Sequence, residues 1–266
     1  MLNLPLNSFN MAITNRQDGS LYINVENKIA TVEFGHPAGN SFPGVLLGRL
    51  TEAINTLSHN PDVSIIVLKS EGEGAFCAGA SFNELLAVSN LDDGAVFFSG
   101  FANVINAMRN CSKLIVGRIQ GKAVGGGVGL AAACDYALAT EGSAVKLSEF
   151  TIGIGPFVIA PAVERKMGKA ALSELTLAAH EWKNAYWAQE KGLYAKVFET
   201  IKELDAELDL FTSKLASYNP EALTAMKQVL WEGTENWDVL LADRAKISGR
   251  LVLSDFSRQA LAKLKP

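Results

Sequence analysis

The chain has 266 residues, of which 48% are hydrophobic, and a formal net charge of −4. This length fits one large α/β domain or one domain with a helical appendage, and the hydrophobic content excludes a disordered or fibrous chain. The mild negative charge without a basic block argues against nucleic-acid binding, so an acidic substrate would need a local basic site.

Two strand–loop–helix units are predicted in the first part of the chain. In each unit a short run rich in β-branched residues leads through a glycine-containing loop into helical apolar spacing. Repeated units of this kind predict stacked α/β layers rather than a β-sandwich. The predicted elements are a hairpin at 21–34, a helix at 45–57, a strand at 63–69, a helix at 83–88, a strand at 114–119, a helix at 127–134 and a strand at 135–140.

The last part of the chain, from residue 158, is predicted to be helical because its apolar residues recur at helical spacing. The predicted helices lie at 162–167, 170–179, 187–191, 201–218, 221–231 and 237–264. We therefore predict an α/β body over residues 1–200 and a helical C-terminal region over residues 201–266, whose apolar surface serves oligomerisation.

The loop at 76–82 (FCAGASF), between the first of these strands and its helix, contains mainly small residues. N–H groups near the start of a helix lack intrahelical partners, and small residues let a ligand approach them closely. Glycine also marks ordinary tight turns, so this loop taken alone favours a plain strand-to-helix turn.

A second small-residue segment, GKAVGGGVG at 121–129, begins the next helix. Glycine in a helix costs roughly 1 kcal/mol relative to alanine, so the run needs a compensating role. Close packing against another helix would supply one, and so would a backbone N–H directed at an anion with help from the helix dipole. The glycine spacing fits neither a nucleotide P-loop nor a Rossmann turn.

Glu149 is the candidate acid–base residue. It stands among apolar residues that include Val145, Leu147 and Phe150, and apolar surroundings raise the pKa of a carboxyl group towards neutrality. A carboxyl group tuned in this way can move a proton to or from carbon. The alternative is a surface glutamate paired with Lys146 or with a helix end, and Glu149 taken alone favours that alternative.

Other residue types restrict the compartment and the chemistry. The three cysteines show no metal-ligand spacing, and their odd number suits a reducing compartment. The three histidines are scattered, which leaves few residues for a Ser-His-Asp or metal-histidine mechanism. The first 20 residues lack the apolar segment of a signal peptide, and no apolar run approaches the ~18 residues of a membrane span. We predict a cytoplasmic protein without a membrane segment.

Taken together and in order, the three segments resemble the enoyl-CoA hydratase/isomerase (crotonase) family. The resemblance runs from about residue 23 to the end of the chain, and it is carried by FCAGA at 76–80, GxxxGGG at 121–127, ACD at 133–135 and SE at 148–149. The pattern PxxIxPxV at 156–163 is similar to methylglutaconyl-CoA hydratase-like members. The resemblance implies a crotonase-like fold of stacked ββα layers with a helical C-terminal region.

The resemblance also implies a site for an acyl-CoA thioester. The thioester oxygen would lie between the N–H groups of Ala80 and Gly126, which would stabilise an enolate, and Glu149 would act as general acid/base. The implied substrate-binding residues are Ala38, Ala78, Ala80, Ser81, Phe82, Gly125, Gly126 and Gly129. Coenzyme A is then part of the substrate, and no separate cofactor or metal is expected. The family implies a homotrimer or a dimer of trimers acting in fatty acid metabolism.

Two positions depart from the family pattern. Ser81 stands where the family commonly has Asp, and Gly129 stands where many hydratases carry a second catalytic glutamate. We expect Gly129 to leave open space there. Because Glu149 then stands alone, proton transfer between the α and γ carbons is easier to explain than addition of water.

The sequence therefore predicts an acyl-CoA enzyme of the hydratase/isomerase type. The alternatives are a pure enoyl-CoA isomerase, a decarboxylase or a thioesterase on the same fold. An alternative of another class is a catalytically silent acyl-CoA-binding protein, which would need no carboxylate beside the thioester.

Overall fold

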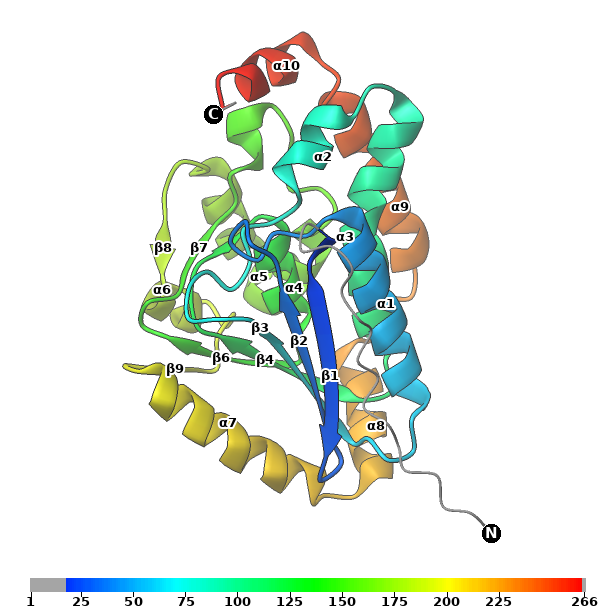
Figure 1. The fold of residues 1–266 in the computed structure, drawn as a ribbon, viewed down its shortest axis with the longest axis vertical. Coiled ribbons are helices and arrows are strands. Elements are labelled where there is room, and N and C mark those ends of the chain that lie inside the picture. The colour runs from blue at the N-terminus through cyan, green and yellow to red at the C-terminus, as the bar shows by residue number, and fades with distance from the viewer. Residues whose placement is uncertain (1–17, 265–266) are drawn as a thin grey trace.

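The computed structural model describes residues 18–264; residues 1–17, most of the segment searched for a signal peptide, lie outside the described residues, as do residues 265–266. Two sheets organise the body (Figure 1). In the larger sheet, of order β1-β2-β3-β4-β6-β9, β1 and β2 are antiparallel and the other neighbours are parallel. Its strands are β1 (Ser20–Glu26), β2 (Ile29–Gly35), β3 (Ile65–Ser70), β4 (Leu114–Ile119), β6 (Tyr136–Thr140) and β9 (Lys196–Phe198). The smaller sheet consists of β5 (Ala123–Val124), β7 (Ala144–Lys146) and β8 (Lys183–Asn184).

Helices surround the two sheets and form the C-terminal region, as predicted. They are α1 (Gly44–His59), α2 (Phe82–Ala87), α3 (Leu91–Asn110), α4 (Gly126–Ala133), the 3₁₀ helix η2 (Glu149–Ile152), α5 (Ala160–Leu177), α6 (Ala185–Glu190), α7 (Ile201–Ala216), α8 (Pro220–Leu230), α9 (Trp237–Leu251) and α10 (Asp255–Ala262). Within residues 18–264, no helix combines the length and apolar content needed to cross a membrane.

Two helical regions differ from the predicted elements. The prediction omits residues 91–110, which form the 20-residue helix α3. Its Gly94 is a packing residue, because a Cβ there would lie 2.7 Å from the backbone of Gly249 on α9. The helix predicted at 237–264 is divided into α9 and α10 at Ser254, whose side chain caps α10 by accepting the N–H of Ser257.

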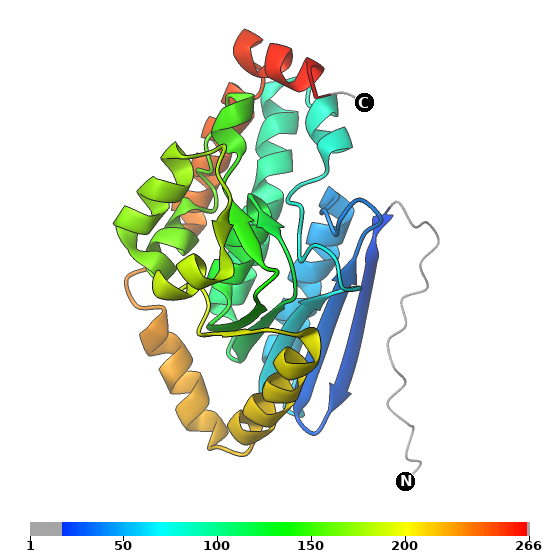
Figure 2. The same cartoon turned by 90° about the vertical axis from the view of Figure 1, so that its left-hand side faces the viewer.

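Helices cover both faces of the larger sheet, which explains the nearly continuous apolar sequence of its central strands. On β3, Ile66 and Leu68 enter the main core, whereas Ile65 and Val67 pack with Leu204 of α7. This alternation is the period-two geometry of a strand. Figure 2 shows α7 and α8 at the end of the molecule opposite to α2 and α10.

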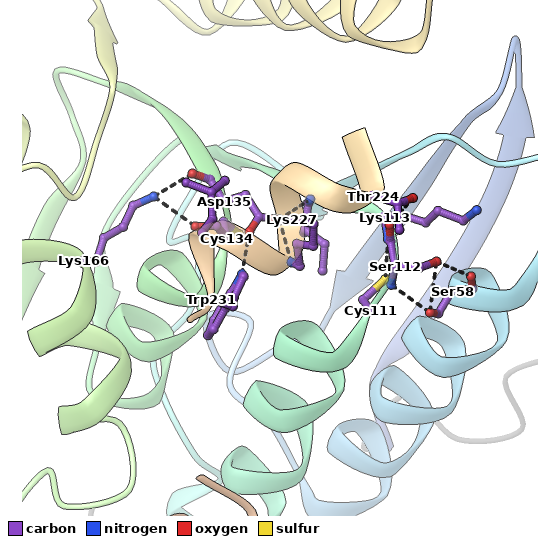
Figure 3. Close-up of polar contacts among 12 residues, drawn as sticks. Ser58, Cys111, Ser112, Lys113, Cys134, Asp135, Lys166, Thr224, Lys227 and Trp231 are labelled. Atoms are coloured by element: carbon purple, nitrogen blue, oxygen red, sulfur yellow. Dashed lines mark hydrogen bonds and ion pairs between the residues drawn. The ribbon is translucent and has the colours of Figure 1, made fainter. Parts of the chain in front are cut away.

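A buried polar cluster joins the C-terminal helices to the sheet (Figure 3). The Asp135 carboxylate, just before β6, accepts hydrogen bonds from Lys227 of α8, the indole N–H of Trp231 and the backbone N–H of Ile115, each at 2.7 Å. Lys166 of α5 donates to the backbone oxygen of Asp135 at 2.8 Å. Asp135 therefore connects both α5 and α8 to the sheet.

Candidate active site

The loop that follows β3 lies beside the segment around β5. The Cys77 N–H donates to the backbone oxygen of Lys122 at 3.2 Å, and the Cys77 oxygen accepts the N–H of Val124 at 2.9 Å. The Cys77 side chain is buried against Gly127, where a Cβ would lie 3.1 Å from Sγ. Burial raises the pKa of this thiol to about 12, so it stays neutral. Cys77 thus fixes the two loops relative to each other.

The end of the first loop presents a free N–H at Ala80. The neighbouring groups are both used, since the Gly79 N–H donates to Cys77 Sγ at 3.3 Å and the Ser81 N–H donates to the Phe42 oxygen at 2.9 Å. The Ala80 N–H itself has no acceptor among residues 18–264. Its direction is therefore fixed by its neighbours while its donor capacity is left for a ligand.

Gly126 presents a second free N–H as the first residue of α4. Within the described chain this group has no acceptor, as expected in the first turn of a helix, whereas the Gly125 N–H donates to the Lys146 oxygen at 2.9 Å. The first loop comes close to it, because a Cβ on Gly79, which has φ +91°, would lie 3.9 Å from the Gly126 nitrogen. The structure thus brings the loops of Ala80 and Gly126 together, as predicted.

Glu149 directs its carboxyl group at the second loop. A Cβ on Gly125, which has φ +52°, would lie 2.9 Å from Glu149 Oε1. Glu149 is half-buried overall, but Oε2 is buried and has no hydrogen-bond partner in the described chain. Burial raises the pKa of this carboxyl group to about 7, against a smaller opposing effect of its own backbone N–H. No ion pair joins it to Lys146 in residues 18–264; Lys146 Nζ instead lies 5.6 Å from the ring centre of Trp182.

Three apolar side chains that were not among the predicted site residues contact the first turns of α4. A Cβ on Gly126 would lie 2.3 Å from the ring of Phe101 on α3. A Cβ on Gly129 would lie 2.5 Å from Ile159, just before α5, and 3.7 Å from Ile105 of α3. The expectation of open space beside Gly129 is therefore wrong, because Ile159 fills it. These contacts join distant parts of the chain, so no local sequence pattern reveals them.

Ser81 and Phe82 lie at the start of α2. The Ser81 hydroxyl accepts the N–H of Glu84 at 3.3 Å and so caps the helix, a role that serine and aspartate both fill well. Phe82 packs against a small apolar cluster that includes Leu85 and Ile154. The serine at position 81 therefore keeps the loop attached to its helix.

Ala38 and Ala78 are exposed and belong to adjoining turns. The Ala78 N–H donates to the Gly39 oxygen at 3.0 Å. Buried Asn40, with φ +57°, holds the first turn in place because its side-chain amide donates to the Ala75 oxygen at 2.8 Å. Ala78 therefore lies within the loop at 76–82, and Ala38 lies in the turn beside it.

A cavity of about 500 Å³ lies elsewhere, and its lining includes Thr31 of β2, Arg118 of β4, and Asp205 and Thr212 of α7. Arg118 there is paired with Asp205, and none of the predicted site residues lines the cavity. In the part of the chain that the structure describes, no cluster of three or more His, Cys, Asp or Glu residues could hold a metal ion.

Comparison with known proteins finds one family that spans most of the chain, including the segments described above. Residues 24–251 match the family model described as enoyl-CoA hydratase/isomerase. A peroxisomal Δ(3,5)-Δ(2,4)-dienoyl-CoA isomerase from Arabidopsis thaliana is 30% identical over 69% of this chain and 70% of the isomerase. A mitochondrial methylglutaconyl-CoA hydratase from Rattus norvegicus is 32% identical over 74% of this chain and 63% of the hydratase. An enoyl-CoA hydratase structure from Bacillus halodurans shares the fold, with a TM-score of 0.84, 20% identity, and coverage of 91% of this chain and 99% of that chain.

Proposed function

The chain belongs to the enoyl-CoA hydratase/isomerase family, whose members act on acyl-CoA thioesters, and from this premise we propose how its site works. We propose that the thioester oxygen lies between the N–H groups of Ala80 and Gly126 and that Glu149 moves the proton on the adjacent carbon. The observation that carries this proposal is the Glu149 carboxyl group, whose buried Oε2 has no partner in the described chain, beside two loops that leave the N–H groups of Ala80 and Gly126 without acceptors.

The two N–H groups favour the enolate over the thioester. Removal of the α-proton places negative charge on the thioester oxygen, and donors fixed by packed loops meet this charge without reorganisation. The dipole of α4 adds positive potential at Gly126. Each donor of this kind contributes about 3–4 kcal/mol to stabilisation of the transition state.

Glu149 is suited to both halves of a proton transfer because its pKa lies at about 7. As a carboxylate it takes the α-proton, and as an acid it returns a proton to carbon. A protein that only bound acyl-CoA would gain nothing from a buried carboxyl group without a partner, since such burial costs free energy. This feature favours catalysis over the silent acyl-CoA-binding alternative.

Ala80→Pro is expected to lower kcat for α-proton exchange by about 100-fold, because it removes one donor of the proposed pair. Position 80 is a better test than position 126, since Ala80 already carries a Cβ whereas any Cβ on Gly126 meets Phe101. Ala80→Gly is the matched control because it keeps the N–H. Exchange measured by NMR in deuterated water, with folding followed by circular dichroism, checks the result. A folded Ala80→Pro variant with the turnover of Ala80→Gly would remove this donor from the mechanism.

We expect kcat/KM for α-proton abstraction to rise with pH through about 7 and then to level off, because burial raises the Glu149 pKa to that value. Below it the carboxyl group holds a proton and cannot accept another. The pH dependence of deuterium incorporation into a saturated acyl-CoA checks this expectation. A profile already flat from about pH 5 would indicate a base with an ordinary glutamate pKa of about 4.3.

We also propose that the protein is cytoplasmic, because its three cysteines are buried and free, which fits a reducing compartment. We propose further that it assembles into trimers or dimers of trimers. Large apolar side chains are exposed on the C-terminal helices, among them Met226 and Val229 of α8 and Val239 of α9. Subunit contacts would remove this surface from water. Light scattering at micromolar concentration should give a multiple of the 28.5 kDa subunit mass. The mass of one subunit throughout that range would contradict the proposed assembly.

A further inference from the structure

One face of α4, which carries a proposed donor, is closed by hydrocarbon. Residues three and four positions apart share a face of a helix, so Gly129 lies one turn beyond Gly125 and Gly126 on the same side. Phe101 covers Gly126, and Ile159 covers Gly129. Glu149 directs a polar side chain at the start of this stretch, next to Gly125.

We propose that Ile159 is the specificity-determining residue that excludes the addition of water and restricts the site to proton transfer between carbon atoms. This inference rests on the function proposed above. A water molecule that adds to an enoyl-CoA must be held by polar groups and must lose a proton to a base. Many hydratases carry a second catalytic glutamate at the position of Gly129. In this chain the space beside Gly129 holds aliphatic carbon instead, since Ile159 Cγ2 and Cβ lie 2.5 and 2.8 Å from the position that a Cβ on Gly129 would take.

Ile159 is held firmly in this position. It is 3% exposed and belongs to the main hydrophobic core. Its backbone oxygen accepts the N–H of Val163 in the first turn of α5, so its backbone is tied to that helix. Glycine at 129 and isoleucine at 159 are therefore matched in volume, and changing one of them alone creates a clash or a void.

Of the reactions that add no water, the one that proton transfer by Glu149 carries out is migration of the double bond of a 3-enoyl-CoA. The Glu149 carboxylate takes a proton from C2, and the electrons of that C–H bond form a dienolate whose negative charge rests on the thioester oxygen. Protonated Glu149 then returns the proton to C4, and the dienolate electrons form the C2=C3 bond. The proton stays within the pair of substrate and Glu149, and neither water nor an oxidant is consumed.

The test compares isomerisation of trans-3-hexenoyl-CoA with hydration of trans-2-hexenoyl-CoA, the products being separated by chromatography. The parent should isomerise at least about 100-fold faster than it hydrates. Gly129→Glu alone should lose isomerisation and gain no hydration, because its side chain collides with Ile159. Gly129→Glu/Ile159→Ala should hydrate at least about tenfold faster than the parent, whereas the matched Gly129→Gln/Ile159→Ala, which lacks the base, should not.

The outcomes separate this inference from the proposed function. A parent that hydrates as fast as it isomerises would overturn the role of Ile159 and leave the enolate mechanism in place. A parent that catalyses neither reaction nor α-proton exchange would overturn both. If the double variants do not fold, Ile159→Asp decides: its carboxylate would hold water and supply a base in the same place, so its products should shift towards 3-hydroxyhexanoyl-CoA severalfold, whereas Ile159→Asn should not shift them. An unchanged product ratio in a folded Ile159→Asp variant would overturn the inference.

Discussion

Glu149→Gln is expected to reduce α-proton exchange and double-bond migration by about 10²–10⁴-fold, the contribution of a well-placed general acid–base. The amide keeps the shape of the carboxyl group but cannot accept the proton. Because the proposed donors are backbone groups, acyl-CoA binding should change little. NMR detection of exchange in deuterated water gives the rate, and calorimetric titration with a saturated acyl-CoA gives the affinity. Exchange at the parent rate would show that another group is the base.

Stability provides the folding control for this variant. The Glu149 carboxyl group is raised to a pKa of about 7 by burial, above its value in the unfolded chain, so the folded state holds the proton more tightly. The parent should therefore lose stability as the pH rises from about 4.3 to about 7, and it carries the full loss at higher pH. Glutamine has no such loss, so Glu149→Gln should unfold at a temperature no lower than the parent at about pH 8. Glu73→Gln, at an exposed position between β3 and the loop at 76–82, should change neither exchange nor stability.

The parts of the site that the sequence predicts are those with a local cause. The loops ending at Ala80 and beginning at Gly126 are recognisable because small residues stand at strand-to-helix turns. The apolar residues next to Glu149 in the sequence predict a raised pKa, and burial of its carboxyl group raises that pKa to about 7 in the structure. Close approach of the two loops depends on long-range pairing, for which the ordered family resemblance was the signal.

What the sequence did not predict depends on contacts between distant segments. The sequence does not predict helix α3, because Gly94 and Gly100 weaken its helical pattern. Gly94 allows α9 to approach, and a Cβ on Gly100 would lie 2.6 Å from Leu47 of α1. The sequence also does not predict the contact of Ile159 with Gly129, because this contact joins distant segments. Glycine at position 129 indicates a lack of side chain, but only the packed structure shows which neighbour fills the space.

The buried pair of Asp135 and Lys227 is a further feature that no local pattern indicates, because 92 positions separate its members. The Lys227 and Asp135 side chains are 2% and 4% exposed, so both charges have been removed from water. Such a pair adds little stability over well-packed apolar residues, but removal of one partner leaves the other charge buried and uncompensated. The effect of a single substitution here should therefore be much larger than at a surface pair.

Lys227→Met is expected to lower the free energy of unfolding by about 3–5 kcal/mol, because the Asp135 carboxylate would stay buried without its cation. At roughly 2–4 °C per kcal/mol for a chain of this size, the unfolding temperature should fall by about 10 °C. Lys246→Met is the matched control: its ion pair with Asp243 is 69% and 60% exposed, and its loss should cost less than about 1 kcal/mol.

The double variant Lys227→Met/Asp135→Asn should lose less stability than the sum of the two single variants, because it removes the uncompensated charge. Urea denaturation gives all of these values, and one protein concentration is used throughout because the proposed assembly would contribute to the apparent stability. Trp231 and Ile115 still donate towards position 135, so the double variant should not regain the full stability of the parent. A Lys227→Met variant no less stable than Lys246→Met would mean that these two donors and the nearby positive charges of Lys166 and Arg165 satisfy Asp135, and that α8 is held to the sheet by its apolar contacts.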